Sequence, residues 1–170
     1  MALIALASCH KEQPAASQPE PEAFSFVVYP GAQYMQELTD LDKKADAVMH
    51  PNGPIPPLAI YDTDAPLETV AEYYVKAYGY GKIAPDATNN LSAARPQAYY
   101  RAGDLNADVA PIQPLLQKLN VNADVTKAQG KYRAVEIEAK RNRPRVTIQR
   151  PYFDVLKSQV IDRTMILMAP

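Results

Sequence analysis

The chain has 170 residues, of which 47% are hydrophobic, and a formal net charge of −1 at pH 7. This charge excludes a general electrostatic attraction to nucleic acid, and the single cysteine excludes an intrachain disulfide or a thiolate zinc site. No stretch contains the roughly 18 consecutive apolar residues of a transmembrane helix. We therefore expect no nucleic-acid partner, no metal site and no cofactor.

A short apolar run at residues 3–8 ends in Ala7 and Ser8, immediately before Cys9. This pattern resembles a bacterial lipobox, in which a signal peptide is cut before a cysteine that then carries lipid. Several acyl chains such as palmitate on one cysteine hold a protein firmly at a membrane, because each buried CH2 contributes about 0.8 kcal/mol. We expect residues 1–8 to be a signal-peptide remnant and Cys9 to be the lipid attachment site.

The tract after the cysteine is polar and carries three prolines within residues 10–22. Such a sequence cannot bury enough apolar surface to become ordered, so we expect residues 9–23 to form a tether and residues 24–170 to form one domain. The apolar run is shorter than a complete signal core of roughly 7–15 residues, so we expect Met1 to be an internal start or the first residue of a shortened sequence. The predicted location is the periplasmic side of the bacterial envelope, and His10 favours the outer over the inner membrane.

Hydrophobic periodicity predicts alternating strands and helices along the domain. Runs of aromatic and β-branched residues indicate strands, and apolar residues spaced by three and four indicate helices. In chain order we expect a strand at 24–29, a turn at Pro30-Gly31, a helix at 33–49, a strand at 58–61, helices at 66–78 and 109–119, a hairpin of strands 135–139 and 146–149, and a strand at 160–168 paired with the segment around Tyr152-Phe153. Residues 82–107 are polar apart from Tyr99-Tyr100 and are predicted to form a long loop or a short strand. The predicted fold class is α+β, with an antiparallel sheet of about four to five strands and two or three helices packed on one face.

The helix at 66–78 has the clearest local signals. Thr63 and Asp64 can cap its start, Pro66 suits its first turn, and Gly79 can end it. Its apolar stripe predicts an amphipathic helix lying on the sheet.

Two motifs carry a resemblance to a known class of proteins. The turn Tyr29-Pro30-Gly31-Ala32 and the Thr63-Asp64-led helix ending in an aromatic-Tyr pair resemble those of uncharacterised bacterial envelope lipoproteins, over residues 26–78. The resemblance implies a small secreted α+β domain. It implies no activity, cofactor or catalytic residue.

Few residues suggest catalysis. Asp62 and Asp64 form an Asp-x-Asp pair at the end of a strand, where two carboxylates could bind Ca²⁺ or Mg²⁺. We prefer a structural interpretation, in which Asp64 helps to cap the helix and Asp62 lies in solvent. His50 is the one histidine of the domain, and no Gly-x-Ser-x-Gly elbow accompanies it. We therefore predict that the protein is not an enzyme.

Basic residues gather around the predicted hairpin, where Arg141, Arg143, Arg145 and Arg150 could form an anion-binding or partner-binding patch. The alternative, which we prefer, is a solvated hairpin whose arginines discourage edge-to-edge aggregation.

The expected function is that of a lipid-anchored, non-catalytic envelope protein, attached to the membrane through Cys9, that docks onto a protein partner or an assembly. The first alternative is a periplasmic binding module for a small or lipidic anionic ligand, which an apolar cavity between helices and sheet would favour. The second is an enzyme, which a tight cluster of buried, hydrogen-bonded polar groups around His50, Asp62 or Asp64 would favour.

Overall fold

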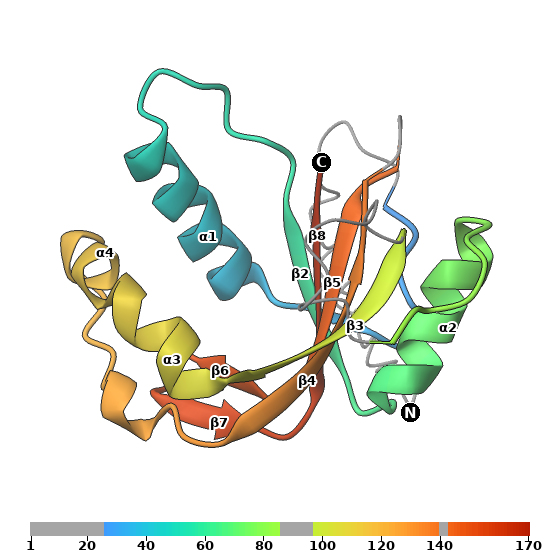
Figure 1. Ribbon diagram of the computed structural model, residues 1–170. Coiled ribbons are helices and arrows are strands. Elements are labelled where there is room, and N and C mark those ends of the chain that lie inside the picture. Colours follow the sequence, from blue (N-terminus) through green and yellow to red (C-terminus); the bar gives the residue numbers. More distant parts are fainter. Residues whose placement is uncertain (1–25, 86–96, 140–142) are drawn as a thin grey trace, which may run out of the picture.

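A computed structural model describes residues 26–85, 97–139 and 143–170 (Figure 1). The predicted leader and tether, with Cys9, lie outside the described residues, as does Arg141. Within the described ranges, every helix is too short or too polar to cross a lipid bilayer.

Six strands form the main sheet, and every neighbouring pair is antiparallel. The predicted α+β class with an antiparallel sheet is confirmed, with more strands than the expected four to five. A separate two-stranded hairpin lies at one end. In spatial order, the main sheet contains β1 (Gln33–Tyr34), β2 (Ala59–Thr63), β8 (Thr164–Ala169), β5 (Arg145–Arg150), β4 (Lys131–Ile137) and β3 (Ala98–Asp104), and the hairpin contains β6 (Tyr152–Asp154) and β7 (Gln159–Ile161).

The helices are divided between the two sides of the sheet, whereas the sequence predicted them on one face. Helix α2 covers one face, and α1, α3 and α4 lie on the other side (Figure 1). The elements are α1 (Gln36–Met49), α2 (Leu67–Ala77), α3 (Leu105–Val109), α4 (Gln113–Lys118) and the 3-10 turns η1 (Ala110–Ile112) and η2 (Val125–Lys127).

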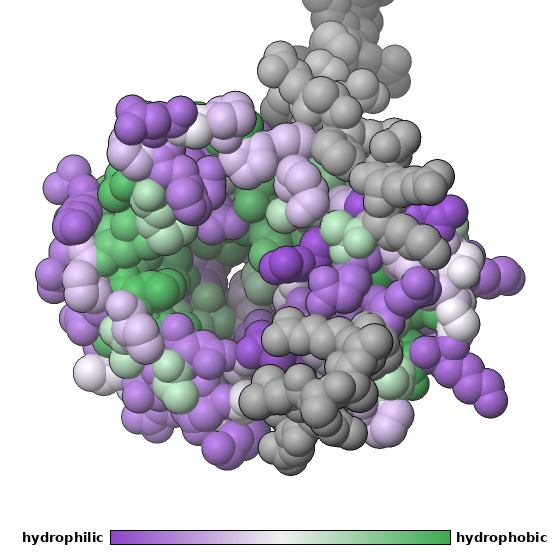
Figure 2. All heavy atoms as spheres, turned by 45° about the horizontal axis from the view of Figure 1, so that its top comes forward, coloured by the Kyte–Doolittle hydropathy of each residue, from purple (hydrophilic) through white to green (hydrophobic). Residues whose placement is uncertain are grey.

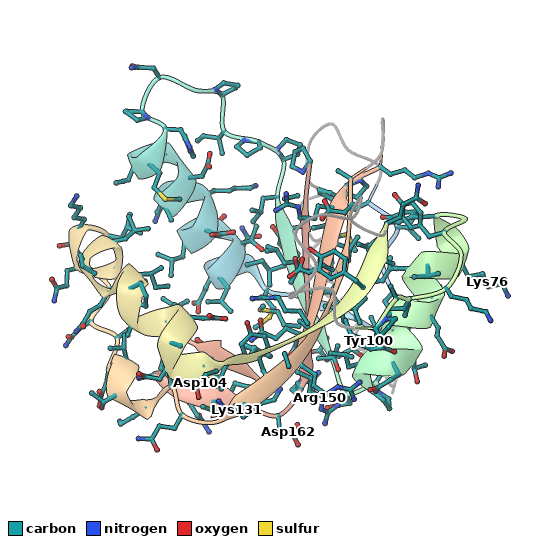
Figure 3. The ribbon with its side chains drawn as sticks, in the orientation of Figure 1. Lys76, Tyr100, Asp104, Lys131, Arg150 and Asp162 are labelled. Carbon is teal, nitrogen blue, oxygen red and sulfur yellow. The ribbon has the colours of Figure 1, made fainter. Side chains whose placement is uncertain are left out.

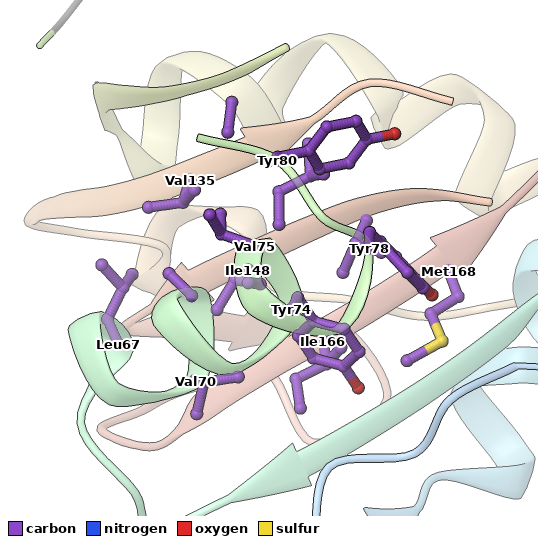
Figure 4. Close-up of a cluster of buried hydrophobic side chains, with 14 of the residues drawn as sticks. Leu67, Val70, Tyr74, Val75, Tyr78, Tyr80, Val135, Ile148, Ile166 and Met168 are labelled. Atoms are coloured by element: carbon purple, nitrogen blue, oxygen red, sulfur yellow. The ribbon is translucent and has the colours of Figure 1, made fainter. Parts of the chain in front are cut away.

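Alternate residues of the central strands form an apolar face under α2, as the strand period of two requires. The cross-strand rows on this face are Ala98–Ile137–Val146–Met168–Ala59 and Tyr100–Val135–Ile148–Ile166–Tyr61. Val70, Ala71 and Tyr74 of α2 are fully buried against these rows (Figure 4). Burial of apolar surface stabilises by about 25 cal/mol per Å², so this layer is the main core of the domain.

A second, smaller core lies under α3. Leu105 packs there with Tyr132 and Ala134 of β4 and with Phe153 of β6. Asp104 caps α3, because its carboxylate accepts the N–H groups of Asn106 and Ala107.

The predicted strand at 24–29 is wrong for the residues that the structure describes. Residues 26–29 have no strand conformation, and Phe26 and Tyr29 instead pack against the main core. The Tyr29 N–H donates a 3.1 Å hydrogen bond to the Tyr74 hydroxyl. The turn that follows is confirmed, since the Ala32 N–H binds the Tyr29 carbonyl and Gly31 has a φ of 80°.

The predicted helix at 109–119 is divided into α3, η1 and α4. Pro111 and Pro114 lack the N–H groups that a continuous helix would need, and each lies in the first turn of a short helical piece. The predicted strand at 160–168 is likewise interrupted, at Asp162–Arg163, into β7 and β8. Its expected pairing with the segment around Tyr152-Phe153 is confirmed by β6–β7.

The long polar segment 82–107 contains β3, a seven-residue edge strand. Residues 86–96 of this segment lie outside the described residues. The hairpin of β4 and β5 is confirmed, with Ile137 paired to Val146 across the two strands.

Candidate functional site

Helix α1 contributes no residue to either hydrophobic core. Of its 14 residues, only Thr39 and Ala45 are buried. The Thr39 hydroxyl accepts the Ile60 N–H at 3.0 Å and so ties the helix to the edge of β2. The remaining apolar residues of α1 are half-buried or exposed, with Val48 44% exposed and Met49 56% exposed. The helix is therefore attached at the sheet edge without being packed into the sheet.

A hollow separates the helices α1, α3 and α4 from the open face of the sheet (Figure 2). Hydrophobic residues line its helical side in the left half of the view. Leu38, Leu41, Ala45 and Val48 recur at three- and four-residue spacing and form one stripe of α1. The hollow thus has an apolar wall on the side of the helices.

The sheet forms the floor of this hollow, and its character changes from strand to strand. One row across the floor is Tyr99–Glu136–Thr147–Leu167–Ile60, and the next is Arg101–Ala134–Gln149–Met165–Asp62. The floor is charged on β3 and β4 and polar on β5. It becomes apolar at Met165 and Leu167 of β8, next to β2 and α1. We call these two rows the open floor, within which Ala134 is fully buried in the second core and Ile60 and Asp62 are buried at the β2 end. The other residues form a gradient from charged to apolar, as an amphipathic surface does.

Arg101 lies between two carboxylates at the charged end of the open floor. Its Nε is 3.4 Å from Glu136 Oε1 and its guanidinium is 3.7 Å from Asp108 Oδ2, and the group lies over the Tyr132 ring. Within the described residues, no N–H of Arg101 donates a hydrogen bond, although Nε is buried. The side chain is 33% exposed. Arg101 is thus held by charge and by contact with the Tyr132 ring, without a hydrogen bond to any described residue.

The carboxylates beside Arg101 have donors of their own. The Thr147 hydroxyl donates to Glu136 at 2.7 Å, and the Tyr132 hydroxyl donates to Asp108. Burial, followed by the hydrogen bond to Asp108, raises the pKa of Tyr132, so this phenol remains a neutral donor. Thr147 fixes the Oε2 atom of Glu136, whereas Oε1 lies toward Arg101. The Glu136 side chain is 14% exposed.

A second polar cluster lies at the other end of the open floor, around Asp62. Arg163 Nε donates to Asp62 at 2.6 Å, and the Tyr152 hydroxyl donates to the same carboxylate at 3.2 Å. Arg163 also binds Asp64. A pocket of 420 Å³ opens beside this cluster, at the start of α1, and Lys157 lies on its far wall.

The structure corrects the interpretation of the Asp-x-Asp pair. Asp62 is 8% exposed and does not lie in solvent. Asp64 is exposed and makes no cap, because α2 begins at Leu67 after Pro66 with no side-chain cap. The sequence could not show this, since the partner Arg163 is 101 residues from Asp62.

The cluster around Asp62 consists of buried, hydrogen-bonded polar groups, which is part of the arrangement that would favour an enzyme. Burial raises the pKa of Tyr152, with the Asp62 charge adding to the effect, so the phenol keeps its proton at neutral pH. His50 lies elsewhere, exposed at the end of α1 and 3.0 Å from Asp46. Among the described residues, no three His, Cys, Asp or Glu side chains are placed to hold a metal ion. The contacts of the cluster fit a tie between β2, β6 and β8.

The arginines suggested as a patch are distributed over the sheet, as far as the structure describes them. Side chains of β5 alternate between the two faces of the sheet. Arg150 therefore lies on the same face as Val146 and Ile148, under α2, whereas Arg145 is exposed on the other face. Five residues of strand, about 17 Å, separate these two. Arg143 lies at the other end of α2, with its guanidinium 5.9 Å from the Tyr78 ring centre.

Arg150 is engaged in internal contacts. Its Nε donates to Asp162, which lies beside it at 2.9 Å (Figure 3). Its guanidinium also donates to the main-chain carbonyl of Asp64. Next to it on β4, Arg133 binds Glu68 of α2 at 2.5 Å. These contacts tie the start of α2 to the sheet.

In comparisons with known proteins, no family model, no curated protein and no solved structure matches the chain. Function is therefore inferred from the open floor, the helical wall above it and the N-terminal motif.

Proposed function

We propose that the protein is a lipid-anchored envelope protein of bacteria whose domain binds an amphipathic ligand in the hollow above the open floor. The observation that carries this proposal is the position of α1 outside both cores. Only Ala45 of its apolar stripe is buried, whereas Leu38 and Leu41 are half-buried and Val48 is exposed. Covering apolar surface contributes about 25 cal/mol per Å². A ligand with an apolar chain would supply the missing contacts.

The gradient of the open floor supports the same proposal. Arg101 and Glu136 lie at one end, and Met165 and Leu167 lie near the other, on the side of α1. Ligand sites combine an apolar lining with a few placed polar groups in this way. We therefore propose ligand binding, the first alternative from the sequence, as the main function in place of docking onto a protein partner.

The membrane anchor rests on the motif at Ala7-Ser8-Cys9 and on the resemblance to envelope lipoproteins. Behind a complete bacterial signal peptide, the protein should gain acyl chains and fractionate with membranes. Cys9→Ser should abolish the added mass and release the protein into the soluble periplasmic fraction. Equal retention of the serine variant in membranes would refute the anchor.

Ligand binding can be tested with the Cys9→Ser chain and the fluorescent apolar probe anilinonaphthalene sulfonate. We expect saturable binding of one probe per chain. Leu41→Gln should weaken it about tenfold, because it removes an apolar side chain from the wall of the hollow.

Lys44→Gln is the matched control, since Lys44 is exposed on the same helix. Thermal unfolding of both variants would show whether α1 and the domain remain folded. Absence of saturable binding, or the same affinity in both variants, would contradict the proposal.

A second candidate function is docking onto an envelope protein, and one observation favours it. Val48, Met49 and Ile55 are exposed apolar residues at the end of α1 and in the loop that follows. Under this function, a partner recovered with the acylated protein from mild detergent should be lost on Ile55→Ser. Recovery that is unchanged in this variant would count against docking through the tip of α1.

A further inference from the structure

We infer that the hollow is a phospholipid site with a zwitterionic head group, whose phosphate binds Arg101 and whose ammonium binds Glu136. This inference rests on the proposed function, because it names the ligand class of the same hollow. The acyl chain would cross β8 toward the apolar stripe of α1.

Arg101 is suited to a phosphate because, within the described residues, its terminal N–H groups donate no hydrogen bond and meet Asp108 only as an ion pair at 3.7 Å. The carboxylates of Glu136 and Asp108, at 3.4 and 3.7 Å, hold the positively charged guanidinium of Arg101 at this point of the floor. Within the described residues they accept no hydrogen bond from it. The cation–π contact with Tyr132 fixes the plane of the guanidinium. The buried Nε is not accessible to a ligand, but the planar terminal N–H groups belong to a side chain that is 33% exposed and can bind phosphate in a bidentate manner.

Glu136 is suited to an ammonium group on the same ligand. Thr147 donates to Oε2 and thereby holds the carboxylate in place, while Oε1 lies toward Arg101 at a distance longer than a normal hydrogen bond to nitrogen. An ammonium needs an acceptor of this kind. Arg101 and Glu136 therefore offer one positive and one negative group side by side.

This pairing selects between classes of lipid. A purely anionic head group would be attracted by Arg101 and repelled by Glu136 and Asp108, all within a few ångströms. A purely cationic one would meet the reverse. A zwitterion can place its phosphate at Arg101 and its ammonium beside the two carboxylates, so that each of its charges meets an opposite one.

The size of the floor is consistent with one extended chain. Arg101 on β3 and Asp62 on β2 share a row and are separated by four strand spacings, about 19 Å. Ala134 offers no surface along this row, because it is fully buried in the second core. The chain would instead follow the neighbouring row past Thr147 and Leu167 before it reaches α1. The apolar part of the lipid is thus placed where the floor is apolar.

The test measures the affinity of the full Cys9→Ser chain for three dihexanoyl lipids, each below its micelle concentration. Phosphatidylethanolamine is the zwitterionic probe, phosphatidylglycerol is the anionic probe, and diacylglycerol has no charged head. We expect phosphatidylethanolamine to bind most tightly. Arg101→Gln should weaken its binding about tenfold and should also weaken that of phosphatidylglycerol.

Glu136→Gln should weaken phosphatidylethanolamine about tenfold and leave phosphatidylglycerol unchanged or tighter, because only the ammonium loses a partner. Arg133→Gln and Glu68→Gln are matched controls, since this ion pair lies on the opposite face of the sheet. Their affinities should equal that of the parent chain.

Two negative results have different meanings. If the three lipids bind with equal affinity and neither Arg101→Gln nor Glu136→Gln changes it, the hollow binds lipid chains and the head-group inference is overturned. If no lipid binds, diacylglycerol included, the proposed function fails and the inference fails with it.

Discussion

The Tyr132 ring fills the space in which a side chain at Gly103 would lie. The two residues pair across β3 and β4, and a Cβ added to Gly103 would lie 2.4 Å from the Tyr132 Cζ and hydroxyl oxygen. Tyr132 is 2% exposed, and it supports Arg101 on its other side. The glycine therefore permits the ring position on which the Arg101 site depends.

Gly103→Ala should destabilise the domain by about 2 kcal/mol, because the aromatic ring must shift out of a packed position. Urea unfolding measures the change. Gly81→Ala is the control, since no atom lies within 4 Å of a Cβ at that position. Equal stability of the two variants would show that Tyr132 moves without cost.

Two tyrosines of the main core should respond in opposite ways to loss of the hydroxyl. The Tyr74 hydroxyl accepts the Tyr29 N–H, so Tyr74→Phe should cost about 1 kcal/mol. The buried Tyr78 hydroxyl has no hydrogen-bond partner within the described residues, and burial raises its pKa to about 12. Tyr78→Phe should be neutral or stabilising in the same unfolding experiment. A larger loss for Tyr78→Phe than for Tyr74→Phe would contradict this description of the core.

The ion pair of Asp62 and Arg163 should be asymmetric. Arg163→Met leaves a carboxylate whose side chain is only 12% exposed with Tyr152 as its remaining side-chain donor, at a cost of about 3 kcal/mol. Asp62→Asn keeps an acceptor for Tyr152, and Arg163 can turn toward solvent, so about 1 kcal/mol is expected. Chemical unfolding of both variants tests the order, with Arg145→Met as a surface control. Equal costs would mean that Asp62 is less enclosed than the structure shows.

Asp42 should make stability depend on pH in a defined direction. Burial on α1, with repulsion from Asp46 added, raises its pKa above the ordinary value of 3.8. The folded state then disfavours the charged carboxylate, and this penalty is present at neutral pH and is relieved as the pH falls through the raised pKa.

Asp42→Asn should therefore raise the melting temperature at pH 7, and the difference from the parent chain should vanish near pH 3. Asp40→Asn is the control, because it removes the same charge from α1 while its amide oxygen can still accept the Gln36 side-chain N–H. A gain for Asp42→Asn that is the same at both pH values would contradict this assignment.

The elements with strong periodicity could be predicted from the sequence. Helix α2 and the β4–β5 hairpin follow from apolar residues at regular spacing, and this spacing depends on no distant partner. Strand β3 was expected only as a possible short strand within 82–107. Its length could not be predicted, because its apolar residues are interrupted by Arg101, Gly103 and Asp104 and it is defined by its pairing with β4.

Only part of the candidate site could be predicted from the sequence, because the rest depends on pairing with distant strands. Glu136 alternates with Val135 and Ile137, so one solvent-facing side of the hairpin that carries Glu136 was expected. Arg101 was missed because it lies in the segment 82–107, for which a short strand was expected but could not be placed. The gradient across the open floor depends on strand order, which places β8 between β2 and β5, and no local pattern indicates this order.

Hydrogen–deuterium exchange of α1, with and without dihexanoyl phosphatidylethanolamine, tests the central claim most directly. Because α1 belongs to neither core, its amides should exchange faster than those of α2 in the free Cys9→Ser chain. The lipid should slow exchange in α1 and in β3 around Arg101, and leave α2 unchanged. Exchange of α1 that is as slow as that of α2 without lipid, or that does not respond to a bound lipid, would contradict a ligand site above the open floor.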